Sequence, residues 1–140
     1  MIEVVNRQRK IKIKPESWTR LAGEMLNAIG KEGSSATIAF VSDTKIRELN
    51  QRFRGIDSAT DVLSFPDGPQ LKRAQVQHLG DIAISLERAA IQAKQNGLKF
   101  DEEISQLILH GLLHLCGYDH EADNGEMNRL ERRLRRKLGI

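Results

Sequence analysis

Short runs of apolar and β-branched residues, bounded by turn-forming residues, predict four β-strands. These runs are residues 2–6 (IEVVN), 36–42 (ATIAFVS), 60–66 (TDVLSFP) and 80–85 (GDIAIS). The third run ends at Pro66, whose nitrogen cannot donate to a strand ladder, so we expect this strand at the edge of the sheet. Residues 67–78 contain polar, Gly and Pro residues and are expected to form a loop.

Apolar residues that recur every three or four positions predict five helices. They are expected from Pro15 to Gly30, from a cap at Ser42 or Asp43 through Phe53, from Leu86 to Asn96, from about Asp101 to Cys116, and from about Asp123 onward. In the last helix, Asp123 and Glu126 have the spacing of a capping box. The helix that ends near Cys116 is apolar on nearly all sides, which predicts a central, buried position.

The mixture of strands and helices, without strict alternation, predicts an α+β fold. We expect a single domain over residues 1–140, in which a small mixed four-stranded sheet is covered by helices. The chain is 39% hydrophobic and 29% charged, which is typical of a globular protein rather than a disordered one. We find no signal-peptide pattern and no apolar run of membrane-spanning length, so no membrane partner is expected. The single cysteine, Cys116, excludes an internal disulfide and fits a reducing cytoplasm.

The charge of the chain is mildly basic and unevenly placed. The formal net charge is +3, and residues 129–137 (RLERRLRRK) carry six basic residues and one acid. Such a run is usually an exposed helix face, and it is also compatible with contacts to RNA phosphates. Aromatic residues make up only 4% of the chain, so base stacking is not expected to be the main contribution to RNA binding.

Three of the four histidines lie within eleven residues, in the stretch HGLLHLCGYDH at 110–120. His110 and His114 are four residues apart on the predicted buried helix, so their side chains share one face. Gly117 is a natural left-handed helix terminator that can return His120 toward the first two. Three imidazoles suit Zn²⁺, and the lack of a good fourth protein ligand predicts an open, catalytic site.

The same residues allow other interpretations. The histidines could be satisfied core or surface residues, although three at this spacing disfavour that interpretation. Cys116 should point to the opposite face of the helix from His114, as a small core residue rather than a fourth ligand. His78 has no ligand spacing and is expected at the surface. A zinc peptidase helix reads H-E-x-x-H, whereas Gly111 stands at the glutamate position here.

The histidine stretch resembles the signature of the YbeY family of single-strand-specific, metal-dependent endoribonucleases. Two further segments are similar to motifs of that family, namely LNQRFRGIDSATDVLSFP at 49–66 and LGDIAIS at 79–85. The resemblance therefore spans residues 49–120, and the N-terminal third and the last twenty residues are less diagnostic.

The resemblance implies one zinc ion per chain, bound by His110, His114 and His120. It implies cytoplasmic action in ribosomal RNA maturation, chiefly at the 3′ end of the small-subunit RNA, and in ribosome quality control. The expected partners are single-stranded RNA, small-subunit ribosomal RNA and the ribosome, with no DNA. The resemblance also places Arg54 in the active-site cleft.

Arg54 and the zinc ligand His114 are the candidate catalytic residues. A guanidinium can grip a phosphate through two parallel hydrogen bonds, and zinc can activate water without a glutamate base. Asp119 could orient an imidazole or serve as a turn residue, and both roles stay open. Thr60, Asp61 and Ser64 are expected as strand-start and packing residues, without a catalytic role.

Two alternatives to the endoribonuclease remain at this stage. The first is a ribosome-assembly factor whose zinc is mainly structural and which acts by binding. The second is a zinc peptidase, which Gly111 makes less favourable.

Overall fold

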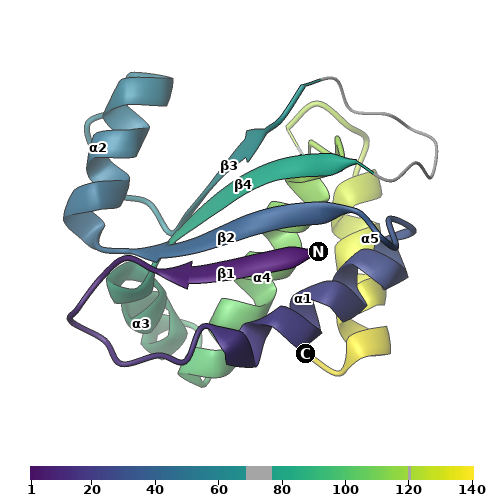
Figure 1. The fold of residues 1–140 in the computed structure, drawn as a ribbon, viewed down its shortest axis with the longest axis horizontal. Helices are drawn as coiled ribbons and strands as arrows, with labels where there is room; N and C mark the ends of the chain where they lie inside the picture. Colours follow the sequence, from purple (N-terminus) through teal and green to yellow (C-terminus); the bar gives the residue numbers. More distant parts are fainter. Residues whose placement is uncertain (69–76, 120) are drawn as a thin grey trace.

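The four predicted strands form one mixed sheet (Figure 1). The computed structural model describes residues 1–68, 77–119 and 121–140. The strands are β1 (Ile2–Asn6), β2 (Ser35–Val41), β3 (Val62–Pro66) and β4 (His78–Ser85), and their order across the sheet is β1-β2-β4-β3. β1, β2 and β4 run parallel, whereas β3 pairs antiparallel with β4. β3 is therefore an edge strand, as its terminal proline predicted.

Five helices accompany the sheet. They are α1 (Glu16–Ile29), α2 (Asp43–Arg54), α3 (Leu86–Gln95), α4 (Phe100–Leu115) and α5 (Glu126–Leu138). α1, α3, α4 and α5 lie on one face of the sheet, and α2 lies on the other (Figure 1). The α+β prediction is confirmed, with a single domain built on one small mixed sheet.

The central position predicted for the fourth helix is also confirmed. Ten of the 16 residues of α4 are buried, so this helix forms the middle of the main hydrophobic core. The core joins it to inward-facing sheet residues such as Ile38 and Ile84, and to Met25 of α1 and Leu134 of α5. A smaller core lies under α2 on the opposite face, around Ile46 and Leu63. Any side chain presented by α4 therefore stands on a rigid element.

Several element boundaries differ by one to three residues from the sequence prediction, and two of these differences have a visible cause. β4 begins at His78, inside the predicted loop, because His78 pairs with Ser35 of β2 beyond a register shift in the ladder. α5 begins at Glu126 rather than near Asp123, because Gly125 has a left-handed φ of 93°. The Asp123 carboxylate still accepts hydrogen bonds from the first backbone N–H groups, those of Gly125 and Met127.

The expected capping box is wrong in detail. The carboxylate of Glu126 accepts from the N–H of Asn124, at 2.6 Å, instead of reaching back to Asp123. Most of the predicted loop at 67–78 falls on residues 69–76, which lie outside the described residues. Within the described part of the chain, no helix combines the length and the apolar character needed to cross a membrane.

Candidate active site

α4 presents two imidazoles side by side near its C-terminal end. The Nε2 atoms of His110 and His114 are 3.1 Å apart, and the ring planes meet at 81°. One turn of helix separates the two residues, so their side chains leave the same face. Both side chains are only partly exposed, because α4 is packed into the core.

This arrangement fits a metal ion. Zinc binds imidazole nitrogen at about 2.0–2.1 Å, so one ion can bond to two nitrogens that are up to about 4 Å apart. The observed separation of 3.1 Å between the two Nε2 atoms is within that limit. The third predicted ligand, His120, lies outside the described residues. Among the residues that are described, no group of three ligand-type side chains is gathered at one point.

A carboxylate from another helix stands behind the first histidine. Glu131 of α5 places Oε1 3.1 Å from Nδ1 of His110. The Glu131 side chain is only 16% exposed, so this contact is sheltered from bulk water. In the tautomer that donates Nδ1–H to Glu131, His110 has an unprotonated Nε2 directed toward His114. The contact thus holds the imidazole in the orientation and tautomer that a metal ligand requires.

The chain turns sharply after the histidine helix. Gly117 has a φ of 96°, and its N–H donates to the carbonyl of His114, while the N–H of Tyr118 donates to that of Leu113. The predicted left-handed terminator is therefore confirmed. Asp119 follows as a turn residue, since its Oδ1 accepts from the N–H of Glu121 at 3.0 Å.

Arg54 and the histidine pair line the same surface concavity, which has a volume of about 540 Å³. The arginine comes from the end of α2, whereas the histidines come from α4. Its side chain is exposed and therefore accessible to a ligand. The turn after α4 supplies another wall, and β3 with the residues before it supplies a third. The lining consists of Arg54, Thr60, Asp61, Val62, Leu63, Ser64, Pro66, His110, His114, Gly117, Tyr118, Asp119 and Glu121.

The loop that follows Arg54 is fastened to α2. Arg47 donates two hydrogen bonds to the carboxylate of Asp57, at 2.8 and 3.2 Å. These hydrogen bonds, together with the arginine charge, lower the pKa of Asp57 below its ordinary value. The buried Asn50 also donates to the carbonyl of Ser58. The end of α2 and its loop are thus held together as a unit beside the concavity.

The wall residues before and within β3 make structural contacts. The Asp61 carboxylate accepts from the N–H of Val62 at 2.8 Å and from the hydroxyl of Thr60 at 3.3 Å. Ser64 donates its hydroxyl to the carbonyl of Gly111 at 3.3 Å, which ties β3 to α4. These contacts agree with the strand-start and packing roles expected for the three residues.

The sequence model of the family described as Endoribonuclease YbeY matches residues 3–139. This chain belongs to the YbeY family.

Relatives support the assignment to the YbeY family, and a solved structure has a similar fold. The chain is 49% identical to the Endoribonuclease YbeY of Solibacter usitatus, over 78% of this chain and 69% of that protein. It is 41% identical to that of Aquifex aeolicus, over 86% and 77%. The identity to that of Clostridium botulinum is 37%, over 100% and 99%. The solution structure of TM1509 from Thermotoga maritima is similar with a TM-score of 0.68 and 25% identity, over 99% of this chain and 89% of that one.

In this YbeY-family chain, Gly111 is packed closely against the sheet. A Cβ atom at Gly111 would lie 3.0 Å from two side-chain carbons of Ile82 in β4. Ile82 is 1% exposed, so it is enclosed on its other sides. A larger side chain at position 111 would press on Ile82, so the packing disfavours a glutamate there.

Cys116 and His78 lie in the surroundings that the sequence predicted, the core and the surface respectively. Cys116 packs against the main core, and burial raises the pKa of its thiol to about 11. A thiol in this state is protonated at neutral pH, as expected for a residue that fills space in the core. His78 is exposed, with Nδ1 2.8 Å from the hydroxyl of Ser35, and it does not line the concavity.

The sequence interpretation missed Glu131. Its only signal is that it is the single acid in the basic run 129–137. The role suggested for Asp119 as an orienting acceptor is filled at His110 by this glutamate from α5, twenty-one residues away in sequence.

Proposed function

We propose that this chain is a zinc-dependent, single-strand-specific endoribonuclease. We further propose that it acts in the cytoplasm in ribosomal RNA maturation, at the 3′ end of the small-subunit RNA, and in ribosome quality control. The proposal rests on one observation: Arg54 lines the same concavity as His110 and His114, although it is far from them in sequence. The names of the relatives, each an Endoribonuclease YbeY, support RNA as the substrate.

In this proposal, one zinc ion is held by His110, His114 and His120. Neutral imidazoles are good zinc donors, and the spacing of the two described Nε2 atoms is compatible with binding to one ion. When bound, zinc would supply Lewis-acid polarisation of a phosphoryl oxygen and would make a water molecule more acidic. The glutamate base of peptidases is then unnecessary, in agreement with the glycine at position 111.

The protein side chains act on position, charge and proton placement. Glu131 accepts a hydrogen bond from the Nδ1–H of His110 and so keeps the Nε2 lone pair directed at the site. Arg54 offers up to two parallel N–H donors to a phosphate. It can bind the scissile phosphate in the ground state and stabilise the negative charge that develops during cleavage. His114 completes the imidazole pair and is required for both metal binding and catalysis.

Two other functions predict different behaviour. A zinc peptidase of the H-E-x-x-H type would lack its general base here, because position 111 is glycine. A ribosome-assembly factor with structural zinc would bind RNA without cleaving it. The position of Arg54 favours an endoribonuclease over an assembly factor with structural zinc. This cation can bind a phosphate in the same concavity as the proposed metal ligands His110 and His114.

Cleavage of a single-stranded RNA by purified protein tests the proposal. We expect the wild-type protein to cleave a labelled single strand, to leave the same sequence intact in a duplex, and to leave a peptide substrate intact. His114→Ala should abolish cleavage, whereas His78→Ala, a change at an exposed histidine outside the concavity, should retain it. RNA binding without any cleavage by zinc-loaded wild type would favour the assembly factor instead.

A further inference from the structure

The positive charge of the chain is concentrated in α5. This helix contains six basic and two acidic residues, a net charge of +4. The whole chain has a net charge of +3, so the remaining residues together have a net charge of −1. A polyanion that approaches the molecule therefore meets its attractive field mainly at this helix.

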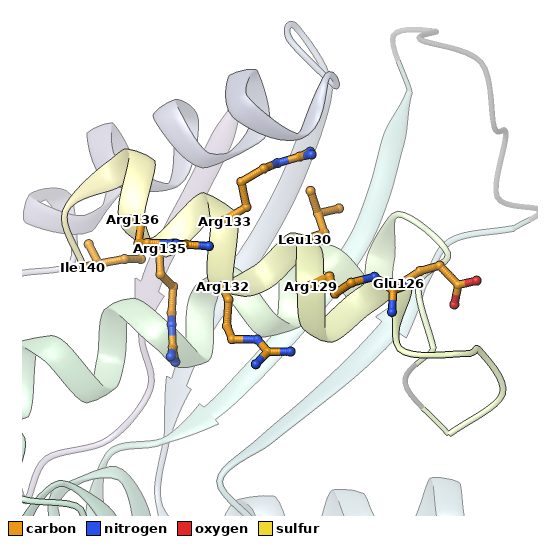
Figure 2. Close-up of a pocket in the computed structure, with 8 residues that line it drawn as sticks. All are labelled: Glu126, Arg129, Leu130, Arg132, Arg133, Arg135, Arg136 and Ile140. Atoms are coloured by element: carbon orange, nitrogen blue, oxygen red, sulfur yellow. The ribbon is translucent and has the colours of Figure 1, made fainter.

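The basic side chains of α5 form an open surface (Figure 2). A concavity of about 850 Å³ lies along the helix, and most of its lining is arginine. Arg132 and Arg135 extend from one side of the helix, and Arg133 extends from the other (Figure 2). The lining residues are Glu126, Arg129, Leu130, Arg132, Arg133, Arg135, Arg136 and Ile140.

These arginines keep most of their hydrogen-bonding capacity for a ligand. Within residues 1–68, 77–119 and 121–140, no salt bridge joins an α5 arginine to a carboxylate. Arg129 and Arg132 each donate one hydrogen bond to a backbone carbonyl, and Arg135 donates to Gln106 of α4. A guanidinium has five N–H donors, so each of the three retains several.

The same helix contacts the histidine site. Arg132 and Arg135 share a smaller concavity, of about 310 Å³, with Asn128 and Glu131. Glu131 in turn contacts His110. Arg132 and Arg135 therefore lie beside the glutamate that contacts the proposed zinc ligand His110.

We propose that Arg129, Arg132, Arg133 and Arg136, named here the α5 arginine face, bind the phosphate backbone of the RNA outside the cleavage site. This inference rests on the proposed function for the identity of the strand. Positions 129 and 136 are seven residues apart, which is about 10 Å along a helix. Four arginine side chains spread over that length can contact more than one phosphate of the strand. α5 has no aromatic residue, so the contact is with phosphates rather than bases.

A membrane surface fits this helix less well. An amphipathic helix that lies on a membrane buries its apolar face among the lipids. In α5 that face is already used inside the protein, because Met127 and Leu134 are buried and Leu130 and Leu138 pack against the core. The surface left outside is cationic without an apolar stripe, which suits a hydrated polyanion such as RNA.

The test replaces Arg129, Arg132, Arg133 and Arg136 together by glutamine. The control replaces the exposed Arg9, Lys10, Lys12 and Lys14, which precede α1, and removes the same charge. Binding of a labelled single-stranded RNA of about 20 nucleotides is followed by fluorescence anisotropy across a salt series, in parallel with cleavage. Each phosphate contact contributes about 0.7 to the slope of log K against log salt for a single strand.

We expect the α5 variant to lower that slope by about 2–3, to raise KM for cleavage, and to leave kcat and zinc content near wild type. The control should change the slope by much less. An unchanged slope in the α5 variant, or an equal loss in the control, would overturn the inference. So would α5-dependent binding to phosphatidylserine vesicles with an unchanged RNA slope. If wild type binds RNA but cleaves none, the proposed function fails, while the anisotropy result still decides the role of α5.

Discussion

At the scale of single residues, the histidine pair depends on a carboxylate that belongs to another helix. Oε1 of Glu131 lies within hydrogen-bond distance of Nδ1 of His110. The Nε2 atoms of His110 and His114 are 3.1 Å apart. Carboxylates behind metal-binding histidines fix both the ring and its tautomer. The strength of metal binding should therefore respond to Glu131, although the glutamate itself binds no metal in this account.

We predict that Glu131→Ala weakens zinc binding about 10–100-fold, the usual effect of removing such an orienting group. Glu131→Gln should lose less, because its side-chain carbonyl can still accept the Nδ1 proton. Competition with a chromogenic chelator measures the affinity without reference to cleavage. The control is Glu24→Ala, a loss of charge on the exposed side of α1, where Glu24 pairs with Arg20. Equal zinc affinity in Glu131→Ala and wild type would show that the contact is structural.

The zinc content of single variants should also distinguish the three proposed histidine ligands from the neighbouring Cys116. We predict that His110→Ala, His114→Ala and His120→Ala each lose most of one bound zinc per chain, because each removes an imidazole donor. Cys116→Ala should keep it, since the thiol packs against the core with a pKa raised to about 11. Metal analysis after gel filtration gives the answer. Full occupancy in the three histidine variants would refute the ligand set, and loss in Cys116→Ala would identify a fourth ligand.

At the scale of elements, the close approach of α4 to β4 fixes where the histidines stand. Two helical glycines offer a matched comparison: Gly111 meets Ile82, whereas a Cβ at Gly23 in α1 would meet nothing within 4 Å. We predict that Gly23→Ala stabilises the fold by about 0.5–1 kcal/mol, because alanine lowers the entropic cost of the helix. Gly111→Ala should instead destabilise it, because overpacking of a core costs about 1–3 kcal/mol.

Gly111→Glu should destabilise more strongly, since it also buries a charge without a partner. Urea unfolding of the three variants measures these differences, and peptidase assays on Gly111→Glu should stay negative despite the restored H-E-x-x-H sequence. A stable Gly111→Glu protein would contradict the packing argument for this position.

The elements were largely predictable because their signals are local. Apolar periodicity located all four strands and five helices, and Pro66 identified the edge strand. One boundary failed on a local feature, because the left-handed Gly125 delays the start of α5. Another failed because a distant contact decides it, since His78 joins the sheet through Ser35. The His110–Glu131 contact could not be predicted for the same reason. It depends on how α5 packs on α4, and the sequence marks it only as a lone acid among arginines.

At the scale of the whole molecule, the proposed site is a meeting of segments that lie far apart in sequence. The spacing of the histidines predicted a metal site by itself, whereas Arg54 was placed there only through the family resemblance. The structure brings Arg54 to the same concavity as His110 and His114. The place of His120 stays a prediction, since it lies outside the described residues. The central claim is that this concavity is one catalytic site for RNA.

Single-turnover cleavage of a single-stranded RNA by Arg54→Ala tests that claim most directly. We predict a rate about 10²–10³-fold below wild type, with unchanged zinc content and thermal melting, because a positioned charge-stabilising donor is lost. Arg54→Lys should recover only part of the rate, since a lysine ammonium cannot form the two parallel hydrogen bonds that a guanidinium donates to a phosphate. Arg52→Ala, an exposed arginine on the same helix outside the concavity, should cleave like wild type. A wild-type rate in Arg54→Ala, or a loss of zinc or of the folded state, would contradict the account.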